Sequence, residues 1–372
     1  MKFYLTTTKA LWKEALPLLF VGLILFTTVT VLVSLMKGVE SFFVQHLRVQ
    51  DLIAVMQPAV AIVLPVSLPA AWLVSILLTV GRWSIENEII ALRACGIGIH
   101  QLLIPFLILA IPVTVLMVQL SLFSQPHALA SRNSALFDLT SNMVQRAMQR
   151  GSLIENFQEM RGLTFYSREI DDALSLRHIL LIDERNPDQP VTILAESGKL
   201  IEDRTARELA IELQQGEIHA TFRDRPLYRL FTFKTMRFNL TEGMKLPFQQ
   251  NHPTLFERDY HELRQEIAAM LAKKKSPHWQ QLMLHKRLAS PVLCLLLPLI
   301  GVPLAIGPTR RSNARSITIG ILVILGYFLL MRAGDTAVQN QWLSPIVAAW
   351  GPNAVYLAAG AFLFSRKIAT GS

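Results

Sequence analysis

Six long apolar runs constrain the fold of this chain more than any other feature of its sequence. The 372 residues are 52% hydrophobic and only 17% charged, a balance typical of membrane proteins. A helix needs about 20 mostly apolar residues to cross the hydrocarbon core of a bilayer. We therefore predict an α-helical membrane protein with six transmembrane helices, of which the fifth is the shortest. The runs cover residues 16–36, 58–80, 102–123, 288–307, 317–331 and 346–364.

Basic residues are distributed unevenly among the short segments between these runs. If the N-terminus is cytoplasmic, the short outer loops hold only Lys37, Arg48 and Arg332, and the short cytoplasmic segments hold most of the others. The positive-inside rule then places both termini in the cytoplasm and residues 125–285 in the periplasm. This topology explains most of the net charge of +9, so no nucleic-acid partner is expected.

The segment between the third and fourth runs is too long to be a simple loop. From Gly162 it alternates short apolar and polar stretches with the turn-forming sequences ERNPDQP and RDRP, a pattern typical of antiparallel strands. We predict three domains. Residues 1–124 hold three spans, residues 125–285 hold a periplasmic β domain with flanking helices, and residues 286–372 hold three more spans. An open jelly roll or a sandwich fits the β domain; one small sheet packed on the membrane domain is the alternative.

Motifs of common catalytic sites are absent from the sequence. It contains no G-x-x-x-x-G-K-[ST] phosphate loop and no G-x-S-x-G elbow. In HELRQE, Gln265 stands where a zinc protease would have its second histidine. We therefore expect no enzyme activity, metal or cofactor in this chain. The spans contain almost no acidic residues for a proton relay, and Asp335 can pair with Arg332 one helical turn away. Energy for any transport must come from another chain.

A short charged segment, GRWSIENEIIALRACG (81–96), lies between the second and third runs. It predicts a helix over residues 84–95, with Ser84 as its N-cap and Gly96 as its C-terminal stop. A helix of about ten residues is too short to cross a bilayer. At 100° per residue, the apolar side chains form one stripe that Glu88 borders. The stripe contains Ile85, Ile89 and Leu92, and Glu86 and Arg93 share another side.

This helix has two interpretations. A carboxylate beside an apolar ridge suits insertion into a groove of a cytoplasmic protein that offers Arg or Lys. The alternative is a helix lying on the lipid surface, although an anionic leaflet favours Lys and Arg over Glu. Docking to a separate ATPase would supply the missing energy source, so we favour the first interpretation.

Several stretches resemble the lipopolysaccharide export permeases, the paired F and G subunits (LptF/LptG). LPVSLPAAWLVSILLTVGRWSIENEIIALRACGIG (64–98) is similar to their second span and coupling helix. HKRLASPVLCLLLPLIGVPLAI (285–306) resembles their fourth span, and ILAESGKL (193–200) resembles a strand of their periplasmic domain. The layout of three spans, a β domain and three spans also matches, so the resemblance covers nearly the whole chain. RACG (93–96) leans slightly toward the F subunit.

The resemblance implies partners and a substrate. It implies a heterodimer of F and G subunits bound to two copies of a cytoplasmic ATPase, which carries the ATP and Mg²⁺. This complex would extract lipopolysaccharide from the bacterial inner membrane and pass it through β-jellyroll domains to a periplasmic bridge protein. The family's coupling glutamate falls on Glu88. The alternatives are a permease for another ATP-driven exporter, of lipoprotein or peptide, and a non-transporting scaffold or signal transducer.

Two further sets of residues are candidates for contacts with such a lipid. Cations at the outer membrane face could bind its phosphates, and apolar residues one turn inside them could line its cavity. The cations are Lys37, Arg332, Lys286 and Arg287, and the lining residues are Leu32 and Leu329. In the β domain, inward-facing residues could line a path for acyl chains, although ordinary core packing is the stronger expectation for any one of them. These residues are Ile179, Leu181, Ile211, Leu213, Phe231 and Phe233.

Overall fold

The computed structural model describes residues 2–42, 49–96, 98–149, 162–170, 175–186, 190–204, 207–221, 228–240, 255–306 and 313–369. The chain forms two compact units. The first, here called the helical unit, contains Met1–Ser34, Ala59–Leu129 and Leu255–Ser372. The second, the sheet unit, contains Leu35–Pro58 and Ala130–Thr254. The three-part domain division of the sequence remains a prediction.

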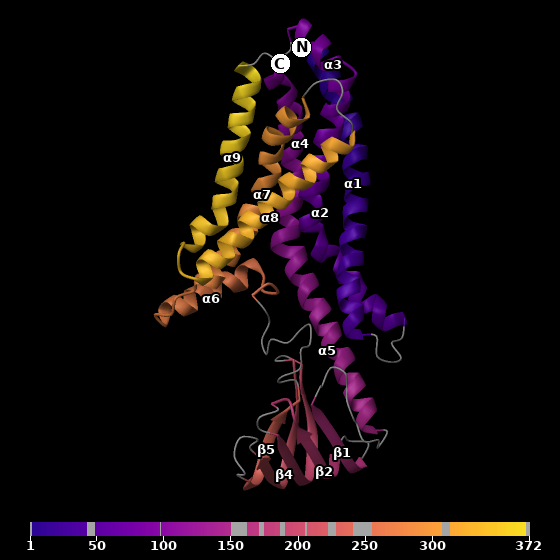
Figure 1. Cartoon of the computed structure of the whole chain (residues 1–372), viewed down its shortest axis with the longest axis vertical. Helices are drawn as coiled ribbons and strands as arrows, with labels where there is room; N and C mark the ends of the chain where they lie inside the picture. Colours follow the sequence, from indigo (N-terminus) through magenta and orange to yellow (C-terminus); the bar gives the residue numbers. More distant parts are fainter. Residues whose placement is uncertain are drawn as a thin grey trace. The chain divides into compact units, whose positions relative to one another are not determined.

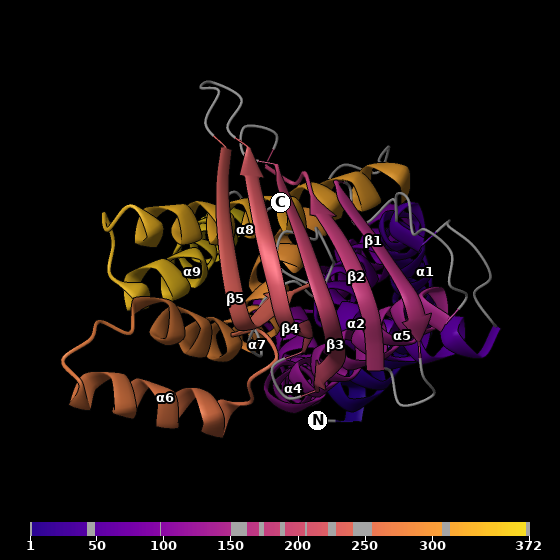
Figure 2. The same cartoon turned by 90° about the horizontal axis from the view of Figure 1, so that it is seen from below.

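Six of the described helical segments are long and apolar enough to cross a membrane, which confirms the six predicted spans (Figure 1). They lie in α1 (Lys2–Phe42), α2 (Val49–Ile85), α4 (Ile99–Gln119) with its continuation through η1 (Leu120–Ser124) into α5 (Gln125–Gln149), α7 (His278–Ala305), α8 (Asn313–Gln339) and α9 (Pro345–Ala369). The remaining described helices are the short α3 (Glu88–Ala94) and α6 (Tyr260–Ala272). Helix α6 lies beside α7 (Figures 1 and 2).

Helix α2 is the centre of the helical unit. Trp72, Leu73 and Ile76 are fully buried, and the indole Nε1 of Trp72 donates to the carbonyl of Cys294 in α7 at 3.1 Å. Gly301 of α7 lies against α2, because a Cβ there would come within 2.9 Å of the Ile76 side chain. The apolar stretch of α2 is 67% buried, whereas that of α1 is only 11% buried. Helix α1 is therefore a peripheral helix of this chain.

Helix α8 is longer than the fifth apolar run. The predicted span stopped at residue 331, but the helix continues through Arg332 and Asp335 to Gln339. The carboxylate of Asp335 lies 2.7 Å from Nζ of Lys286 and 3.6 Å from Nη1 of Arg332. These ion pairs compensate the charges that end the apolar run, so the helix need not stop there.

The strands of the sheet unit form one antiparallel sheet in the order β1-β2-β3-β4-β5 (Figure 2). They are β1 (Leu163–Ile170), β2 (Ser175–Asp183), β3 (Val191–Asp203), β4 (Glu208–Thr221) and β5 (Tyr228–Asn239). Neighbours in sequence are neighbours in the sheet, and each pair is antiparallel. The sheet is not closed, which is consistent with the predicted open jelly roll and excludes a closed sandwich for the described strands.

One face of this sheet is covered by α5. Leu136, Phe137 and Val144 of α5 belong to the same buried cluster as the inward residues of β1 to β4. Helix α5 is thus one of the predicted flanking helices, with one apolar side. Strand β5 differs from its neighbours because most of its residues are exposed. The apolar face is therefore packed over the first four strands, partly packed on β5 at Phe233, Met236 and Phe238, and open at Phe231.

Candidate functional site

The segment between α2 and α4 is a sharp elbow and not one continuous short helix. Helix α2 continues through Ser84 to Ile85, and the backbone N–H of Glu86 still donates to the carbonyl of Arg82 at 2.9 Å. Helix α3 begins only at Glu88, after Asn87 with a φ of 61°. Asn tolerates this left-handed conformation better than most residues. The prediction of Ser84 as N-cap is therefore wrong: Ser84 is buried in the last turn of α2.

Some side chains of the predicted apolar stripe are buried in the helical unit, and others are exposed. Ile89 is buried, and Leu92 packs against the core of the helical unit. Ile85 belongs to α2 and is partly exposed, while Ile90 is 60% exposed. The prediction of a single exposed ridge is thus wrong, because the intervening break at Asn87 rotates α3 relative to α2. The exposed apolar surface of α3 is Ile90 with its small neighbours Ala91 and Ala94.

Glu88 stands at the first position of α3 and is half-buried. Partial burial raises the pKa of its carboxyl group, and the nearby carboxylates of Glu86 and Glu14 raise it further. Arg82 acts in the opposite direction but does not outweigh them. Burial and two neighbouring carboxylates thus disfavour the anionic form of Glu88, and Arg82 favours it. A further cation beside Glu88 would favour the anionic form.

The other predicted charges of the segment have different surroundings. Glu86 lies outside α3, and its carboxylate is 3.6 Å from the guanidinium of Arg82. Arg93 is half-buried in the last turn of α3. The prediction that Glu86 and Arg93 share one side of a single helix is therefore wrong, again because of the break at Asn87.

The structure places the four candidate phosphate-binding cations differently. Lys286 of α7 forms a two-oxygen contact with Asp335 of α8 at 2.7 and 2.9 Å. Arg332 pairs with the same carboxylate, as the sequence predicted, but its side chain is 83% exposed. Lys37 lies in α1, with its side chain outside the described part of the chain. Of the described candidates, Arg332 is the one with its charge open to the surroundings.

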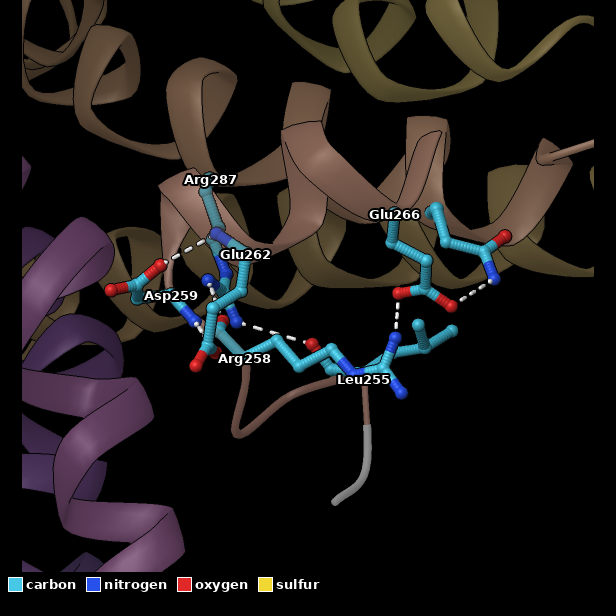
Figure 3. Close-up of polar contacts among 7 residues, drawn as sticks. Leu255, Arg258, Asp259, Glu262, Glu266 and Arg287 are labelled. Atoms are coloured by element: carbon cyan, nitrogen blue, oxygen red, sulfur yellow. Dashed lines mark hydrogen bonds and ion pairs between the residues drawn. The ribbon is translucent and has the colours of Figure 1, made fainter. Parts of the chain in front are cut away.

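Arg287 is buried and binds backbone carbonyls (Figure 3). Its guanidinium donates to the carbonyls of Phe256 at 2.8 Å, Leu255 at 3.3 Å and Arg258. These contacts fix the chain that leads into α6 against α7. Sequence reasoning did not identify this role, although an arginine inside an otherwise apolar helix is a signal that its charge has a local partner.

A second part of the same network orients α6. Asp259 caps α6 through the backbone N–H of Glu262, whose side chain accepts in return from the Asp259 N–H. Glu266 forms an ion pair with Arg258 and accepts from Gln280 of α7 at 3.1 Å (Figure 3). Together with the contacts of Arg287, these hydrogen bonds and this ion pair hold α6 and the chain before it against α7.

The candidate lipid-lining residues fall into two groups. Leu32 of α1 and Leu329 of α8 are 54% and 69% exposed, so both present their side chains outside this chain. Ile179, Leu181, Ile211 and Leu213 are fully buried between the sheet and α5. Phe233 is partly buried, and Phe231 is exposed at the open edge.

Phe231 continues an apolar row that crosses the sheet. The register pairs Leu181 with Ile193, Ile193 with Ile218, and Ile218 with Phe231. These side chains share a face because paired residues in a sheet project to the same side. The row is buried at β2 and β3 and becomes exposed at Phe231, 51% of whose side chain is accessible. The inner face of the sheet is thus continuous with an exposed apolar edge.

Comparison with known proteins assigns the chain to a family. The profile of the family described as lipopolysaccharide export system permease LptF/LptG matches residues 9–366. The chain belongs to the LptF/LptG permease family. It is similar to the lipopolysaccharide export system permease protein LptF of Escherichia coli (strain K12) and of Shigella flexneri. Each is 23% identical over 357 residues, which cover 93% of this chain and 90% of the relative.

Membership confirms the family resemblance drawn from residues 64–98 and 285–306, and both relatives are named as the F subunit. The six apolar helices of the chain and its family indicate a multi-pass permease of the bacterial inner membrane. Such a permease is a transporter subunit and not an enzyme. The family also implies pairing within a lipopolysaccharide exporter.

The Lys286–Asp335 pair should stabilise the permease. Asp335→Asn removes one charge from a pair whose side chains are 23% and 16% exposed, and should lower the free energy of unfolding by roughly 3 kcal/mol. Arg332→Gln is the matched control, because its side chain is 83% exposed, and should cost less than about 1 kcal/mol. Thermal unfolding of the purified proteins in detergent measures both. Equal melting temperatures for the two variants would contradict this assignment.

Proposed function

We propose that this permease is one of two paralogous membrane subunits of an ATP-driven lipopolysaccharide exporter. It extracts the lipid from the inner membrane and passes it to a periplasmic bridge protein of the jelly-roll type. A dimeric cytoplasmic ATPase binds ATP and Mg²⁺ and docks on α3. The observation that carries this proposal is the elbow: a short helix between two spans, with a half-buried carboxylate of raised pKa at its start.

The geometry of α3 supports docking rather than adsorption to lipid. Its exposed surface combines Ile90 with the small residues Ala91 and Ala94, which let a partner approach closely. Glu88 lies one turn of helix before Ala91, and burial and the carboxylates of Glu86 and Glu14 disfavour its charged form. A groove with an apolar floor and an Arg or Lys at one end is complementary to this surface. Among the predicted contact residues, Ile89 and Leu92 then support α3 from within the chain, while Ile85, Glu86 and Arg93 flank the contact.

Glu88→Ala should weaken binding of the ATPase while the membrane fold stays intact. Removing one partner of a charge pair at a desolvated interface costs roughly 2–5 kcal/mol, because the other charge is left unpaired. The measurement is co-purification of the ATPase with the permease pair. Glu86→Ala is the control and should have a smaller effect, since Glu86 is paired with Arg82. Equal losses in the two variants would favour a diffuse charge effect and contradict the assigned role of Glu88.

The proposed orientation places both termini and α3 in the cytoplasm and the sheet unit in the periplasm. It rests on the distribution of Lys and Arg among the short loops. With this orientation, α3 meets a cytoplasmic ATPase and the open β5 edge meets periplasmic proteins.

Cysteine labelling tests the orientation. In a background with Cys95 and Cys294 replaced by serine, a membrane-impermeant maleimide added to spheroplasts should modify a cysteine placed at Asn186. It should spare one placed at Asn313 until the membrane is permeabilised, because only the first position is periplasmic. Labelling of the Asn313 position in sealed spheroplasts would overturn the topology.

We further propose that lipopolysaccharide passes the exposed sides of α1 and α8 and then the open edge of the sheet. Arg332 is the described cation best placed to meet its phosphates, since Lys286 and Arg287 are engaged by Asp335 and by backbone carbonyls. Lys37 is a further candidate from the sequence. Phe231, with Phe233 behind it, provides the apolar edge for acyl chains. Ile179, Leu181, Ile211 and Leu213 form the packed floor of this path. The edge itself can add a strand of the bridge protein.

Photo-crosslinkers distinguish a lipid path from an ordinary exposed edge. Phe231 and Leu230 are adjacent, 51% and 50% exposed, and point to opposite faces of β5. A crosslinker at Phe231 should capture lipopolysaccharide when ATP is supplied, and one at Leu230 should not. Crosslinkers at Leu32 and Leu329 should capture it within the membrane. Equal capture at positions 230 and 231, or capture of phospholipid alone, would contradict the path.

A further inference from the structure

The cytoplasmic end of α1 holds a carboxylate whose two oxygens bind consecutive residues of α2. Oε1 of Glu14 lies 2.6 Å from Nη2 of Arg82, and Oε2 accepts from the indole Nε1 of Trp83 at 2.9 Å. Trp83 is only 5% exposed, so its N–H needs an acceptor inside the protein. Glu14 supplies this acceptor and neutralises the arginine beside it. Both contacts lie within the last turn of α2, directly before the elbow.

The same end of α1 is joined to neighbouring helices by hydrogen bonds and buried side chains. The hydroxyl of Ser75 donates to the carbonyl of Ala15 at 2.7 Å, and the indole of Trp12 donates to the carbonyl of Pro105 in α4 at 3.0 Å. Leu11 and Ala15 are fully buried. Beyond residue 19, α1 exposes a series of large apolar side chains, among them Phe20, Val21, Ile24, Leu25 and Val29. The hydrogen bonds named here thus join the first half of α1 to α2 and α4, while Leu23 and Phe26 continue its apolar packing farther along.

The charges around the elbow form one continuous group. Arg82 lies between Glu14 and Glu86, at 2.6 and 3.6 Å. Glu88 of α3 is close enough for the carboxylates of Glu14 and Glu86 to raise its pKa. A cation that approached Glu88 would therefore act on the same group of charges that attaches α1 to α2.

We propose that Glu14 is a positioning residue that ties α1 to the elbow, so that movement of α3 is transmitted to α1 as well as to α2. This inference rests on the proposed function, in which the ATPase docks on α3 and its conformational change moves α3. Helix α1 is 41 residues long, about 60 Å at 1.5 Å per residue, and carries Leu32 and Lys37 toward its other end. The tie thus connects the docking helix with the helix that carries candidate lipid contacts. Glu14 itself touches neither the ATPase nor the lipid.

The test uses the full complex of both permease subunits and the ATPase in liposomes that contain lipopolysaccharide. Glu14→Ala removes the acceptor of Trp83 and the partner of Arg82. The ATPase should co-purify in normal amount and hydrolyse ATP, but lipid released per ATP should fall about fivefold or more, the usual lower range of coupling between sites. Glu14→Gln keeps an oxygen for Trp83 and should show a smaller fall. Lys13→Ala, the exposed neighbour in the same turn, should behave as the unchanged protein.

A double-mutant cycle shows whether the pair acts as a unit. If Glu14 acts through Arg82, the variant with both Glu14→Ala and Arg82→Ala should be no worse than the more impaired single variant. A ratio of lipid to ATP that is unchanged in Glu14→Ala would overturn the inference. So would a loss of lipid release that only parallels loss of the ATPase, because Glu14 would then merely build the docking surface. If Glu14→Ala does not assemble, Glu14→Gln carries the same test.

Glu88→Ala, measured beside these variants, separates this inference from the proposed function. If Glu88→Ala leaves both ATPase binding and the ratio of lipid to ATP unchanged, docking on α3 is wrong. If Glu88→Ala loses the ATPase while Glu14→Ala behaves as the unchanged protein, docking stands and only the role of Glu14 is wrong.

Discussion

The hydrocarbon core of a membrane contains no water to bind exposed backbone groups, and this constraint shapes the helical unit. Each peptide group must find its partner within its own segment, so every apolar run becomes a helix. Side chains then decide how the helices pack. Helix α2 is central because one side carries large buried residues such as Trp72 and Ile76, while Gly301 lets α7 approach it closely. Helices α1 and α8 retain exposed apolar surfaces that suit lipid or a partner subunit.

Charged groups in this unit are concentrated near helix ends, where they join one helix to another. Glu14 connects α1 to α2, Lys286 and Asp335 connect α7 to α8, and Arg287 connects α7 to the chain before α6. Such contacts stabilise little at a wet surface but more where water is scarce, because an unpaired charge there is costly. They are also directional, unlike apolar packing, and can therefore fix how two helices are oriented. A transporter that changes shape needs such defined connections between rigid helices.

Both units of the chain leave apolar surface exposed. The helical unit leaves apolar helix sides exposed, and the sheet unit leaves the apolar side chains of Leu230 and Phe231 exposed on β5. In a soluble domain that works alone, an exposed edge with Phe231 and Leu230 would favour association with other strands. In the proposed function, the same edge would contact lipid and a second protein. The packed row behind Phe231 keeps this edge in place.

The sequence by itself determined the class of protein, because length and hydropathy are enough to specify a membrane span, and alternation is enough to indicate strands. It also determined the pairing of Arg332 with Asp335, which lie one helical turn apart. Only the tertiary structure decided the elbow, since periodicity around Glu88 gives one stripe whether that stripe faces the chain itself or a partner. The tertiary structure buries Ile89 in the helical unit and leaves Ile90 exposed. Likewise, it alone brought Glu14 to Arg82, Lys286 to Asp335 and Arg287 to the carbonyls before α6. These contacts join residues far apart in the chain, and sequence spacing carries no information about them.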